Sequence, residues 1–460
     1  MSKLIVVSNR VPDLDKARAG GLAVALSAVL ERSGGLWFGW SGQASAETDT
    51  TPTIKDHGSF KLATIGLSEE DVSEYYQGAG NQVLWPLFHN RSDLMQVYSR
   101  YYDAYRRVNA RFANCLSHLL EPDDTVWVQD FHLFPLGMEL REQGFKGRIG
   151  FFLHIPFPSV DTLGNLPWAG ELMSWLSRYD LVGFQTKRDK WNMTDFLTRV
   201  AGGSETDGEC RLRGRRFRCG TFPVSIDTES WLELVRSDSF SRELERIRSE
   251  LRPPRYPAIG VERLDYSKGL VQRVLAFEKM LVLQRRFHGA ACLYQVVAPS
   301  RGDVPEFRRL KERLDSVTGR INSTYARFNW VPVRYLHRTF THSELAALYR
   351  ICRVGIVSSV IDGMNLVAKE FIVAQDSKDP GVLVLSRFTG AAEELGHHAV
   401  LVNPYDIEGT AEAICDAFDM PLGERQRRWE AMMHILEKHD VHDWATDFIE
   451  TLHAEPSADN

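Results

Sequence analysis

A turn in the second half of the chain carries residues suited to holding a nucleotide diphosphate. Residues 362–370 (DGMNLVAKE) directly follow the apolar run 354–357. A strand that leads through a glycine-containing turn into a helix presents unpaired backbone N–H groups, to which phosphate binds. Glu370 lies about one turn further on, where its carboxylate could accept both hydroxyls of a ribose. An ordinary helix capped by Asn365 explains the same pattern. This segment alone therefore does not distinguish a phosphate site from a capped helix.

Residues 261–269 (VERLDYSKG) place two cations near the start of another helix. We expect a strand to end near Arg263, Ser267 to cap the helix and Lys268 to lie in its first turn. A cation is unfavourable at that positive helix end. An anion bound there would explain Lys268, and Arg263 would add a second charge for a diphosphate leaving group. Arg301, after the strand 292–298, adds a third cation at the same sheet edge; a chance surface cluster is the alternative.

The first half offers a similar arrangement. The strand 4–8 is followed by Arg10, and Gly20 and Gly21 precede a helix expected at 22–31. Paired glycines at a helix start let a ligand approach the backbone closely. Turns and helix caps use such pairs constantly, so a purely structural role is the commoner explanation for the glycines alone.

Polar residues follow two further strands of the first half. Asp130 comes after the strand 126–129, and His154 after the strand 150–153. The carboxyl ends of parallel strands border the ligand crevice of open α/β sheets. His154 alone could equally be a core histidine with satisfied hydrogen bonds. Aromatic residues could form a wall for a sugar ring, although each taken singly is more often part of the core. They are Trp40, Tyr76 and Trp85.

The sequence shows no metal site. Asp13 and Asp15 fit the Asp-x-Asp pattern of metal-dependent sugar transferases, but they lie in a polar loop far from a second acidic cluster. We therefore expect a solvated loop and no metal requirement. The six cysteines have no metal-ligand spacing and are expected to be thiols in a reducing compartment. Cys210 and Cys219 could be cross-strand neighbours in a hairpin, without a structural disulfide.

The elements that position these residues alternate between short apolar strands and helical patterns. Such alternation predicts an α/β fold with parallel sheets covered by helices on both faces. The expected strands are 4–8, 126–129, 150–153, 181–184, 258–263, 292–298, 354–357, 382–385 and 399–402. Two such sheets make two Rossmann-like domains.

A chain of 460 residues is too long for one compact core. We expect a first domain at 1–227 and a second at 228–428, which begins with a charged helix over 228–252. Residues 429–460 are expected to form a helix that packs back on the first domain, followed by a polar tail.

Composition narrows the classes of partner. Hydrophobic residues make up 43% of the chain and charged residues 25%, as in soluble globular proteins. The net charge of -6 argues against a general nucleic-acid binder, and the basic run 211–218 is expected to be a solvated hairpin. No signal-peptide pattern opens the sequence, and no apolar run approaches the ~20 residues of a membrane span. We therefore expect a cytoplasmic protein without a membrane partner.

A collinear series of segments across nearly the whole chain resembles the α,α-trehalose-phosphate synthases. The segments are SNRVP, AGGLAVAL, WFGWSG, VLWP, GFFLHIPFP, DLVGFQT, VERLDYSKGL, SRGDV, DGMNLVAKEF, PGVLVLSRFTGAA and NPYDIEGTA. The resemblance implies a GT-B fold, with two Rossmann-like domains facing across a cleft. It also implies transfer of glucose from UDP-glucose to glucose-6-phosphate, with retention at the anomeric carbon and without a cofactor. Homo-oligomerisation is left open.

The resemblance assigns the donor site residue by residue. The donor residues are Gly21, His154, Arg263, Lys268, Asp362, Leu366, Val367 and Glu370. The two cations would neutralise the departing diphosphate, and Glu370 would hold the ribose. Backbone N–H groups would come from Leu366 and Val367. Asp362 would bind glucose hydroxyls, as would His154 through its side chain or carbonyl.

The resemblance also implies the acceptor site and the mechanism. The acceptor residues are Arg10, Trp40, Tyr76, Trp85, Asp130 and Arg301. The two arginines suit the phosphate of the acceptor, and the aromatic residues suit its sugar ring. The carboxylate of Asp130 suits its hydroxyl groups. The chain shows no enzymatic nucleophile, and retention in this family is usually explained by front-face attack, in which the leaving phosphate takes the acceptor proton. Catalysis then depends on orientation and preorganised cations. The expected catalytic residues are Arg263, Lys268, Asp130 and His154.

The chain departs from the family pattern at three positions that bear on substrate choice. Ile361 stands where the family typically has Arg, Ser225 where it commonly has Gly, and Gln129 where it usually has His. A related synthase with another acceptor, such as a glucosylglycerol-phosphate synthase, or with ADP- or GDP-glucose as donor, is one alternative. A non-catalytic sensor of sugar phosphate is another. A sensor needs no clamp for a leaving group, so it is disfavoured by the presence of Arg263, Lys268, Asp362 and Glu370.

Overall fold

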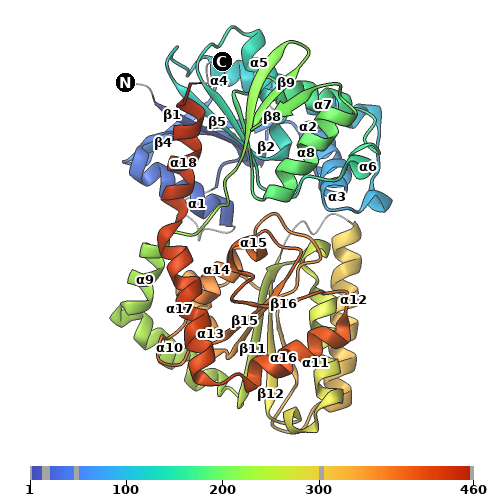
Figure 1. The fold of residues 1–460 in the computed structure, drawn as a ribbon, viewed down its shortest axis with the longest axis vertical. Coiled ribbons are helices and arrows are strands. Elements are labelled where there is room, and N and C mark those ends of the chain that lie inside the picture. Colours follow the sequence, from blue (N-terminus) through green and yellow to red (C-terminus); the bar gives the residue numbers. More distant parts are fainter. Residues whose placement is uncertain (1–2, 13–20, 46–50, 300–304, 456–460) are drawn as a thin grey trace. The chain divides into compact units, whose positions relative to one another are not determined.

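The structure is a computed structural model that describes residues 3–12, 21–45, 51–299 and 305–455. Gly20, Arg301 and the Asp13 to Asp15 loop lie outside the described residues. The chain divides into two compact units, shown in Figure 1. Unit 1 comprises Met1–Val224 together with Val441–Asn460, and unit 2 comprises Ser225–Asp440.

Unit 1 is built on a mostly parallel sheet. Among the described residues its strand order is β3-β4-β2-β1-β5-β6-β7-β10-β9-β8. The strands are β1 (Leu4–Arg10), β2 (Gly35–Ala44), β3 (Thr53–Asp56), β4 (Phe60–Leu67), β5 (Thr125–Gln129), β6 (Ile149–Leu153), β7 (Leu181–Phe184), β8 (Ser204–Thr206), β9 (Glu209–Leu212) and β10 (Arg215–Thr221). At the edges, β3 pairs antiparallel with β4, and β9 pairs antiparallel with both β10 and β8. The central strands β5, β6 and β7 are buried throughout, which explains why their sequences are mostly apolar.

Helices and short turns of unit 1 connect and cover this sheet. They are α1 (Gly21–Ser33), α2 (Glu69–Asp71), the π-helix η1 (Val72–Leu84), α3 (Trp85–Phe88), η2 (Ser92–Leu94), α4 (Ser99–Ser117), η3 (Phe131–Leu133), α5 (Leu136–Glu142), α6 (Val160–Leu163), α7 (Ala169–Leu176), α8 (Lys187–Arg199) and α18 (Val441–His453). α18 returns from the end of the chain, and its Trp444 and Phe448 rings lie 4.8 and 4.9 Å from that of Trp127 in β5.

Unit 2 contains a second sheet in which all neighbouring described strands are parallel, in the order β13-β12-β11-β14-β15-β16. Its strands are β11 (Tyr256–Arg263), β12 (Ala291–Ala298), β13 (Val333–Leu336), β14 (Val354–Val357), β15 (Val382–Ser386) and β16 (Val400–Val402). Its helices and turns are α9 (Thr228–Arg236), α10 (Asp238–Leu251), η4 (Tyr266–Lys268), α11 (Leu270–Leu283), η5 (Arg285–Phe287), α12 (Pro305–Tyr325), α13 (His342–Ile351), α14 (Leu366–Val373), α15 (Ala391–Leu395), α16 (Ile407–Asp419) and α17 (Leu422–Lys438). The expected α/β fold with two Rossmann-like sheets is confirmed.

Two predicted helices are interrupted. The helix expected over 228–252 breaks at Ser237, whose backbone is extended and whose hydroxyl accepts a hydrogen bond from the N–H of Phe240 at 3.1 Å. Serine caps helices in this way, so a second helix, α10, starts there. The helix expected over 429–453 also breaks, between Lys438 and Val441. Residues 429–440 belong to unit 2, and α18 belongs to unit 1.

The basic run 211–218 forms the expected antiparallel hairpin between β9 and β10. Cys210 and Cys219 are buried free thiols on it, with their sulfur atoms 3.4 Å apart. The other cysteines are also buried and free. Within the described ranges, no helix is both long and apolar enough to cross a membrane.

Candidate active site

Two turns in unit 2 carry the residues expected to bind the donor. Asn365 has a left-handed backbone (φ 85°), and its side-chain oxygen accepts from the N–H of Ala368 at 3.2 Å, which starts α14 as expected. The start of α11 differs from the expectation. Asp265, not Ser267, caps the turn that contains Lys268, and α11 begins only after Gly269, whose φ is 61°. A left-handed residue ends the turn, so Lys268 precedes the long helix instead of lying in it.

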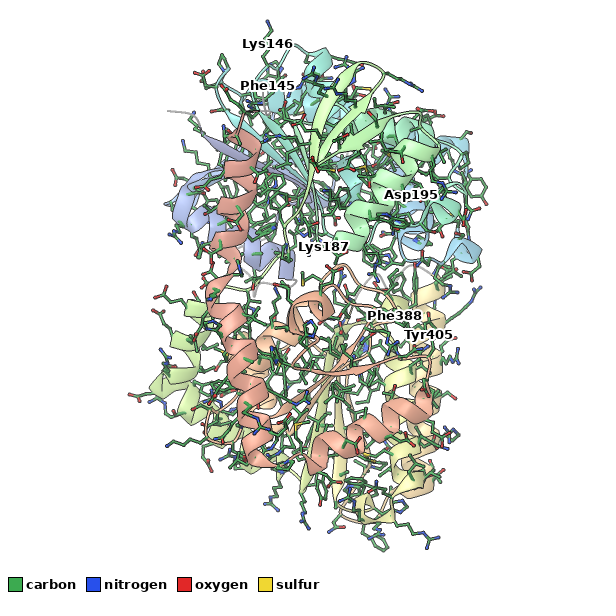
Figure 2. The ribbon with its side chains drawn as sticks, viewed as in Figure 1. Phe145, Lys146, Lys187, Asp195, Phe388 and Tyr405 are labelled. Carbon is green, nitrogen blue, oxygen red and sulfur yellow. The ribbon has the colours of Figure 1, made fainter. Side chains whose placement is uncertain are left out.

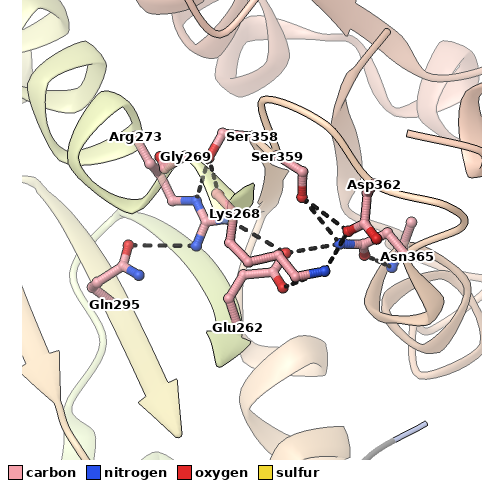
Figure 3. Close-up of polar contacts among 10 residues, drawn as sticks. Glu262, Lys268, Gly269, Arg273, Gln295, Ser358, Ser359, Asp362 and Asn365 are labelled. Carbon is pink, nitrogen blue, oxygen red and sulfur yellow. Dashed lines mark hydrogen bonds and ion pairs between the residues drawn. The ribbon is translucent and has the colours of Figure 1, made fainter. Parts of the chain in front are cut away.

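Lys268 and Asp362 form an ion pair between these two turns. The ammonium nitrogen lies 2.5 Å from Oδ2 of Asp362, as Figure 3 shows. The same oxygen accepts from the hydroxyl of Ser359 at 3.1 Å and from the side-chain amide of Asn365 at 3.0 Å. Burial alone would lower the pKa of Lys268, but the carboxylates of Asp362 and Glu262 raise it above its ordinary value. Lys268 is therefore a charged ammonium group with a fixed position.

A buried carboxylate and a buried guanidinium lie behind this pair. Asn365 donates to Oε1 of Glu262 at 2.8 Å, and Lys268 and Arg273 lie 4.0 and 3.7 Å from the Glu262 carboxylate. Burial raises the pKa of Glu262 and lowers that of Arg273 to about 10. Arg273 also donates to the hydroxyl of Ser358 at 3.0 Å. Two carboxylates and two cations thus hold the donor turns together.

Sequence reasoning missed Glu262 and Arg273 as parts of the site. A signal for each was present, because Glu262 interrupts the apolar strand β11 and Arg273 lies on the buried face of α11. Arg263 is exposed at the end of β11. Its positive charge repels that of Lys268 and acts to lower the pKa of Lys268. These two cations are therefore close enough to act on one anion.

α14 carries the remaining donor residues of unit 2. Its first residues, Leu366 and Val367, are partly exposed, and the N–H groups of a first helical turn have no acceptor within the helix. Glu370 lies one turn on and accepts from the hydroxyl of Tyr349 at 3.1 Å. Burial raises the pKa of Glu370 to about 7. Tyr349, which sequence reasoning missed, therefore orients the carboxylate expected to hold the ribose.

The turn of Asp362 is supported by the segment after β15. The N–H of Asp362 donates to the carbonyl of Phe388 at 3.1 Å, and the N–H of Gly390 donates to the carbonyl of Asp362 at 3.2 Å. The rings of Phe388 and Tyr405, both labelled in Figure 2, lie 6.1 Å apart. The two hydrogen bonds hold the backbone of the donor turn.

In unit 1, Asp130 and His154 are in direct contact. The N–H of His154 donates to Oδ1 of Asp130 at 3.2 Å. Asp130 has a φ of 74°, an unfavourable conformation for a residue with a side chain, and its own N–H donates to the carbonyl of Phe152 at 2.8 Å. The His154 ring lies between two glutamine side chains, and burial lowers its pKa to about 3.

The expected aromatic residues of the acceptor site lie in a series of ring contacts in unit 1. Arg10 and Trp40 are register partners on β1 and β2, and the Trp40 ring lies 5.4 Å from that of Tyr76. Trp85 is buried against Phe131 with the ring centroids 5.8 Å apart, and the ring of His132 lies between Phe131 and Tyr76, 3.9 Å from the first and 5.8 Å from the second. Gly21 is the first residue of α1.

A family model described as Glycosyltransferase family 20 matches residues 6–454 of this chain. The chain belongs to glycosyltransferase family 20. This result confirms the resemblance on which the residue assignments rest, and it identifies the two Rossmann-like units as those of a glycosyltransferase.

Curated members of family 20 match the chain over nearly its full length. Trehalose-6-phosphate synthase of Sinorhizobium fredii is 45% identical, and the match covers 99% of this chain and 99% of that protein. The enzyme of the same name from Klebsiella pneumoniae is 41% identical, over 100% of this chain and 97% of its own.

Solved structures of the family agree with this chain in fold, which confirms the expected GT-B class. A UDP-forming α,α-trehalose-phosphate synthase from Burkholderia xenovorans, in complex with glucose-6-phosphate, has a TM-score of 0.94 and 41% identity over 98% of this chain and 100% of its own. The trehalose-6-phosphate protein of Escherichia coli, bound with UDP-2-fluoro glucose, has a TM-score of 0.93 and 40% identity. The match covers 99% of this chain and 100% of that one.

The three departures from the family pattern lie in different surroundings. Gln129 is fully buried and hydrogen-bonded to His154. Ser225 is also fully buried, and its hydroxyl has no hydrogen-bond partner in the described part of the chain. Ile361 is partly exposed and immediately precedes Asp362. Within the described ranges, no group of three or more metal-ligating side chains occurs.

Proposed function

We propose that this chain transfers glucose from UDP-glucose to glucose-6-phosphate and releases α,α-trehalose-6-phosphate and UDP. The observation that carries the proposal is the Lys268–Asp362 pair beside the first turn of α14, in a chain of family 20. Lys268 offers a fixed cation for a diphosphate, and the first turn of α14 offers backbone N–H groups for the diphosphate oxygens. Asp362 offers a carboxylate for a sugar.

The donor would use unit 2. Lys268 and Arg263 would neutralise the diphosphate, since charge-assisted hydrogen bonds to phosphate are the strong ones. The Lys268 ammonium group has more than one N–H to donate, so it can hold Asp362 and a phosphate oxygen together. Leu366 and Val367 would supply backbone donors, and Glu370 would accept from the ribose hydroxyls. Asp362 would bind hydroxyls of the transferred glucose.

The proposed acceptor residues, apart from Arg301, lie in unit 1. Arg10 would pair with the phosphate of glucose-6-phosphate, and we propose the same for Arg301. The Trp40, Tyr76 and Trp85 rings would line the sugar, because aromatic faces pack well on its apolar C–H surface. Asp130 would accept from its hydroxyls. Gly21 and His154 would complete the donor side.

The proposed transfer proceeds on one face of the glucose ring. The anomeric hydroxyl oxygen of the acceptor forms a bond to C1 of the glucose, while the bond from C1 to the diphosphate oxygen breaks. The electron pair leaves with UDP, whose departing oxygen takes the acceptor proton. Atoms and charges balance without a redox step or an enzymatic nucleophile. The chain contributes orientation and preorganised positive charge.

This chemistry needs no metal ion, because the two cations supply the charge that a metal would otherwise provide.

We propose that the acceptor domain spans 1–227, the donor domain 228–428 and the return segment 429–460. A cytoplasmic location fits the free thiols, which are typical of reducing compartments. Assembly into a homo-oligomer would leave these assignments unchanged.

A donor and acceptor panel tests the proposal. UDP-, ADP- and GDP-glucose are each paired with glucose-6-phosphate and with glycerol phosphate, and nucleotide release is followed. We expect UDP-glucose with glucose-6-phosphate to be the fastest pair. A faster pair would reassign the substrates, and substrate binding without release from any pair would indicate a sensor.

A further inference from the structure

Three polar side chains form a hydrogen-bonded chain at the carboxyl ends of neighbouring strands in unit 1. Gln129 ends β5, His154 follows β6 and Gln185 follows β7. Ring Nε2 of His154 lies 2.8 Å from Oε1 of Gln129, and ring Nδ1 lies 3.3 Å from Nε2 of Gln185. Both glutamines are buried. Both ring nitrogens of His154 are therefore engaged within the protein.

The orientation of each amide follows from its second contact. The N–H of Val224 donates to Oε1 of Gln185 at 2.9 Å, so the amide nitrogen of Gln185 faces His154. The amide nitrogen of Gln129 lies 3.5 Å from the carbonyl of Trp127, so its oxygen faces His154. Consequently Nδ1 accepts and Nε2 donates. The imidazole is neutral, with its proton on Nε2.

The surroundings of the ring favour this neutral state. Phe152 of β6 and Trp444 of α18 pack on it, with ring centroids 4.7 and 5.9 Å away. The carboxylate of Asp130 accepts from the backbone N–H of His154, while the two ring nitrogens face the glutamine amides. Burial is the cause that lowers the pKa of His154. A proton on Nδ1 would also face the amide hydrogens of Gln185, and two donors repel each other.

The backbone of His154 connects this chain to the expected acceptor site. Its N–H donates to the carboxylate of Asp130, which has the strained φ of 74°. A strained residue keeps its conformation only when its surroundings hold it. The ring of His154, held at both nitrogens, keeps the N–H that binds Asp130 in place.

We propose that Gln129 and Gln185 are positioning residues, which hold His154 as one neutral tautomer and thereby fix the Asp130 carboxylate for the acceptor. The inference rests on the proposed function for the identity of the acceptor. It predicts that the His154 ring moves no proton during transfer. It also predicts that turnover does not follow a histidine titration at neutral pH.

Gln185→Glu tests the tautomer directly. The substitution keeps an oxygen to accept from Val224 and replaces the amide donor opposite Nδ1 with a carboxylate oxygen. His154 should then carry protons on both nitrogens, with its pKa raised into the neutral range by the new negative charge. Gln375→Glu is the matched control. Gln375 is a buried amide whose oxygen accepts from Gly381 at 2.9 Å and whose nitrogen donates to the carbonyl of Tyr349.

Histidine ¹⁵N NMR reads the ring state without turnover. The chain has 14 histidines, and His154→Asn identifies the signals of His154 by their loss. In the unsubstituted chain we expect the Nε2–H tautomer to persist from about pH 5.5 to 8.5. In Gln185→Glu the same signals should titrate within that range. A wild-type His154 that titrates there, or a variant in which it stays neutral, overturns the inference.

Turnover supplies the second readout. At saturating substrates, kcat of Gln185→Glu should change by about tenfold across the new titration, because displacement of a positioned group slows transfer. The Kd for UDP should stay constant, since UDP lacks the glucose that His154 would contact. Gln375→Glu should lack the new titration. A kcat profile of Gln185→Glu that matches the wild type overturns the positioning role. Lack of any UDP release alongside a neutral His154 would instead count against the proposed function.

Discussion

The ammonium nitrogen of Lys268 lies 2.5 Å from Oδ2 of Asp362, although 94 residues separate the two in the sequence. The pair joins the turn before α11 to the turn before α14. Both side chains are largely buried, with exposures of 11% and 14%, so removing one partner leaves the other as an uncompensated charge. The pair therefore links the stability of unit 2 to its proposed donor chemistry.

Lys268→Ala should lower kcat by about a hundredfold or more, as expected when a preorganised group that stabilises developing charge is lost. Affinity for glucose-6-phosphate should remain unchanged, because Lys268 is not among its proposed ligands. Steady-state kinetics and calorimetry measure the two effects. Lys279→Ala is the control, since Lys279 also forms an ion pair in unit 2, with Glu408 at 3.0 Å. Wild-type turnover in a folded Lys268→Ala variant would contradict the proposed role of Lys268.

The affinity for UDP-glucose should increase as the pH rises through about 7. Burial raises the pKa of Glu370 to about 7, and the deprotonated carboxylate accepts more hydrogen bonds from the ribose than the protonated form. UDP-glucose is the suitable ligand, because its phosphates are both esterified and do not titrate in this range. Calorimetry between about pH 6 and 8 measures the slope. The slope should vanish in Glu370→Gln; if it persists there, another group titrates.

Tyr349→Phe should move that midpoint upward. The hydroxyl of Tyr349 donates to Glu370 at 3.1 Å and thereby favours its carboxylate form. Without this donor, Glu370 should stay protonated to a higher pH, and UDP-glucose should bind more weakly near neutrality. A midpoint that stays in place would show that the Tyr349 hydroxyl does not control this titration.

The strands of both sheets could be predicted from the sequence because buried parallel strands are short, uninterrupted apolar runs. β2, β3, β4, β8 and β13 were missed. β2 (GLWFGWSGQA) mixes buried aromatic residues with glycines, and this composition is also typical of loops. The breaks at Ser237 and near His439 were missed because the residues on both sides favour helix.

The proposed roles of Lys268, Asp362 and Glu370 were inferred from residue type and from position in or just after the turn that follows a strand, and they stay predictions. Glu262, Arg273 and Tyr349 were not predicted, because their roles depend on tertiary contacts with residues distant in sequence. The same holds for Gln185, which contacts His154 across 31 residues. A single sequence does not show which buried polar residues meet.

Gly269→Ala should destabilise unit 2 by about 3 kcal/mol or more. Part of this comes from the left-handed φ of 61°, which costs a residue with a side chain about 1–2 kcal/mol. The remainder is steric, because a Cβ there would lie 1.9 Å from the carbonyl oxygen of Ser358. Gly289→Ala is the matched control: its φ is 77°, but its added Cβ meets the flexible side chain of Arg327 at 3.1 Å. Equal losses in denaturant unfolding would contradict the steric argument.

Ile361→Arg should lower the KM for UDP-glucose several-fold. A guanidinium beside Asp362 would share its carboxylate and leave more of the Lys268 ammonium group available to the diphosphate. Kinetics with varied donor and acceptor detect the change. Leu401→Arg adds the same charge at a position that is 43% exposed on β16 and controls for net charge. Unchanged donor and acceptor selectivity in Ile361→Arg would make this position neutral.

The product made from glucose-6-phosphate and UDP-glucose labelled with ¹³C at C1 tests the proposed transfer most directly. We predict one phosphorylated disaccharide, with the labelled carbon in an α,α-1,1 linkage and one UDP released for each molecule formed. NMR of the reaction mixture identifies the linkage and its configuration. A labelled product that is free glucose, or a disaccharide with an inverted labelled carbon, would contradict the proposed function.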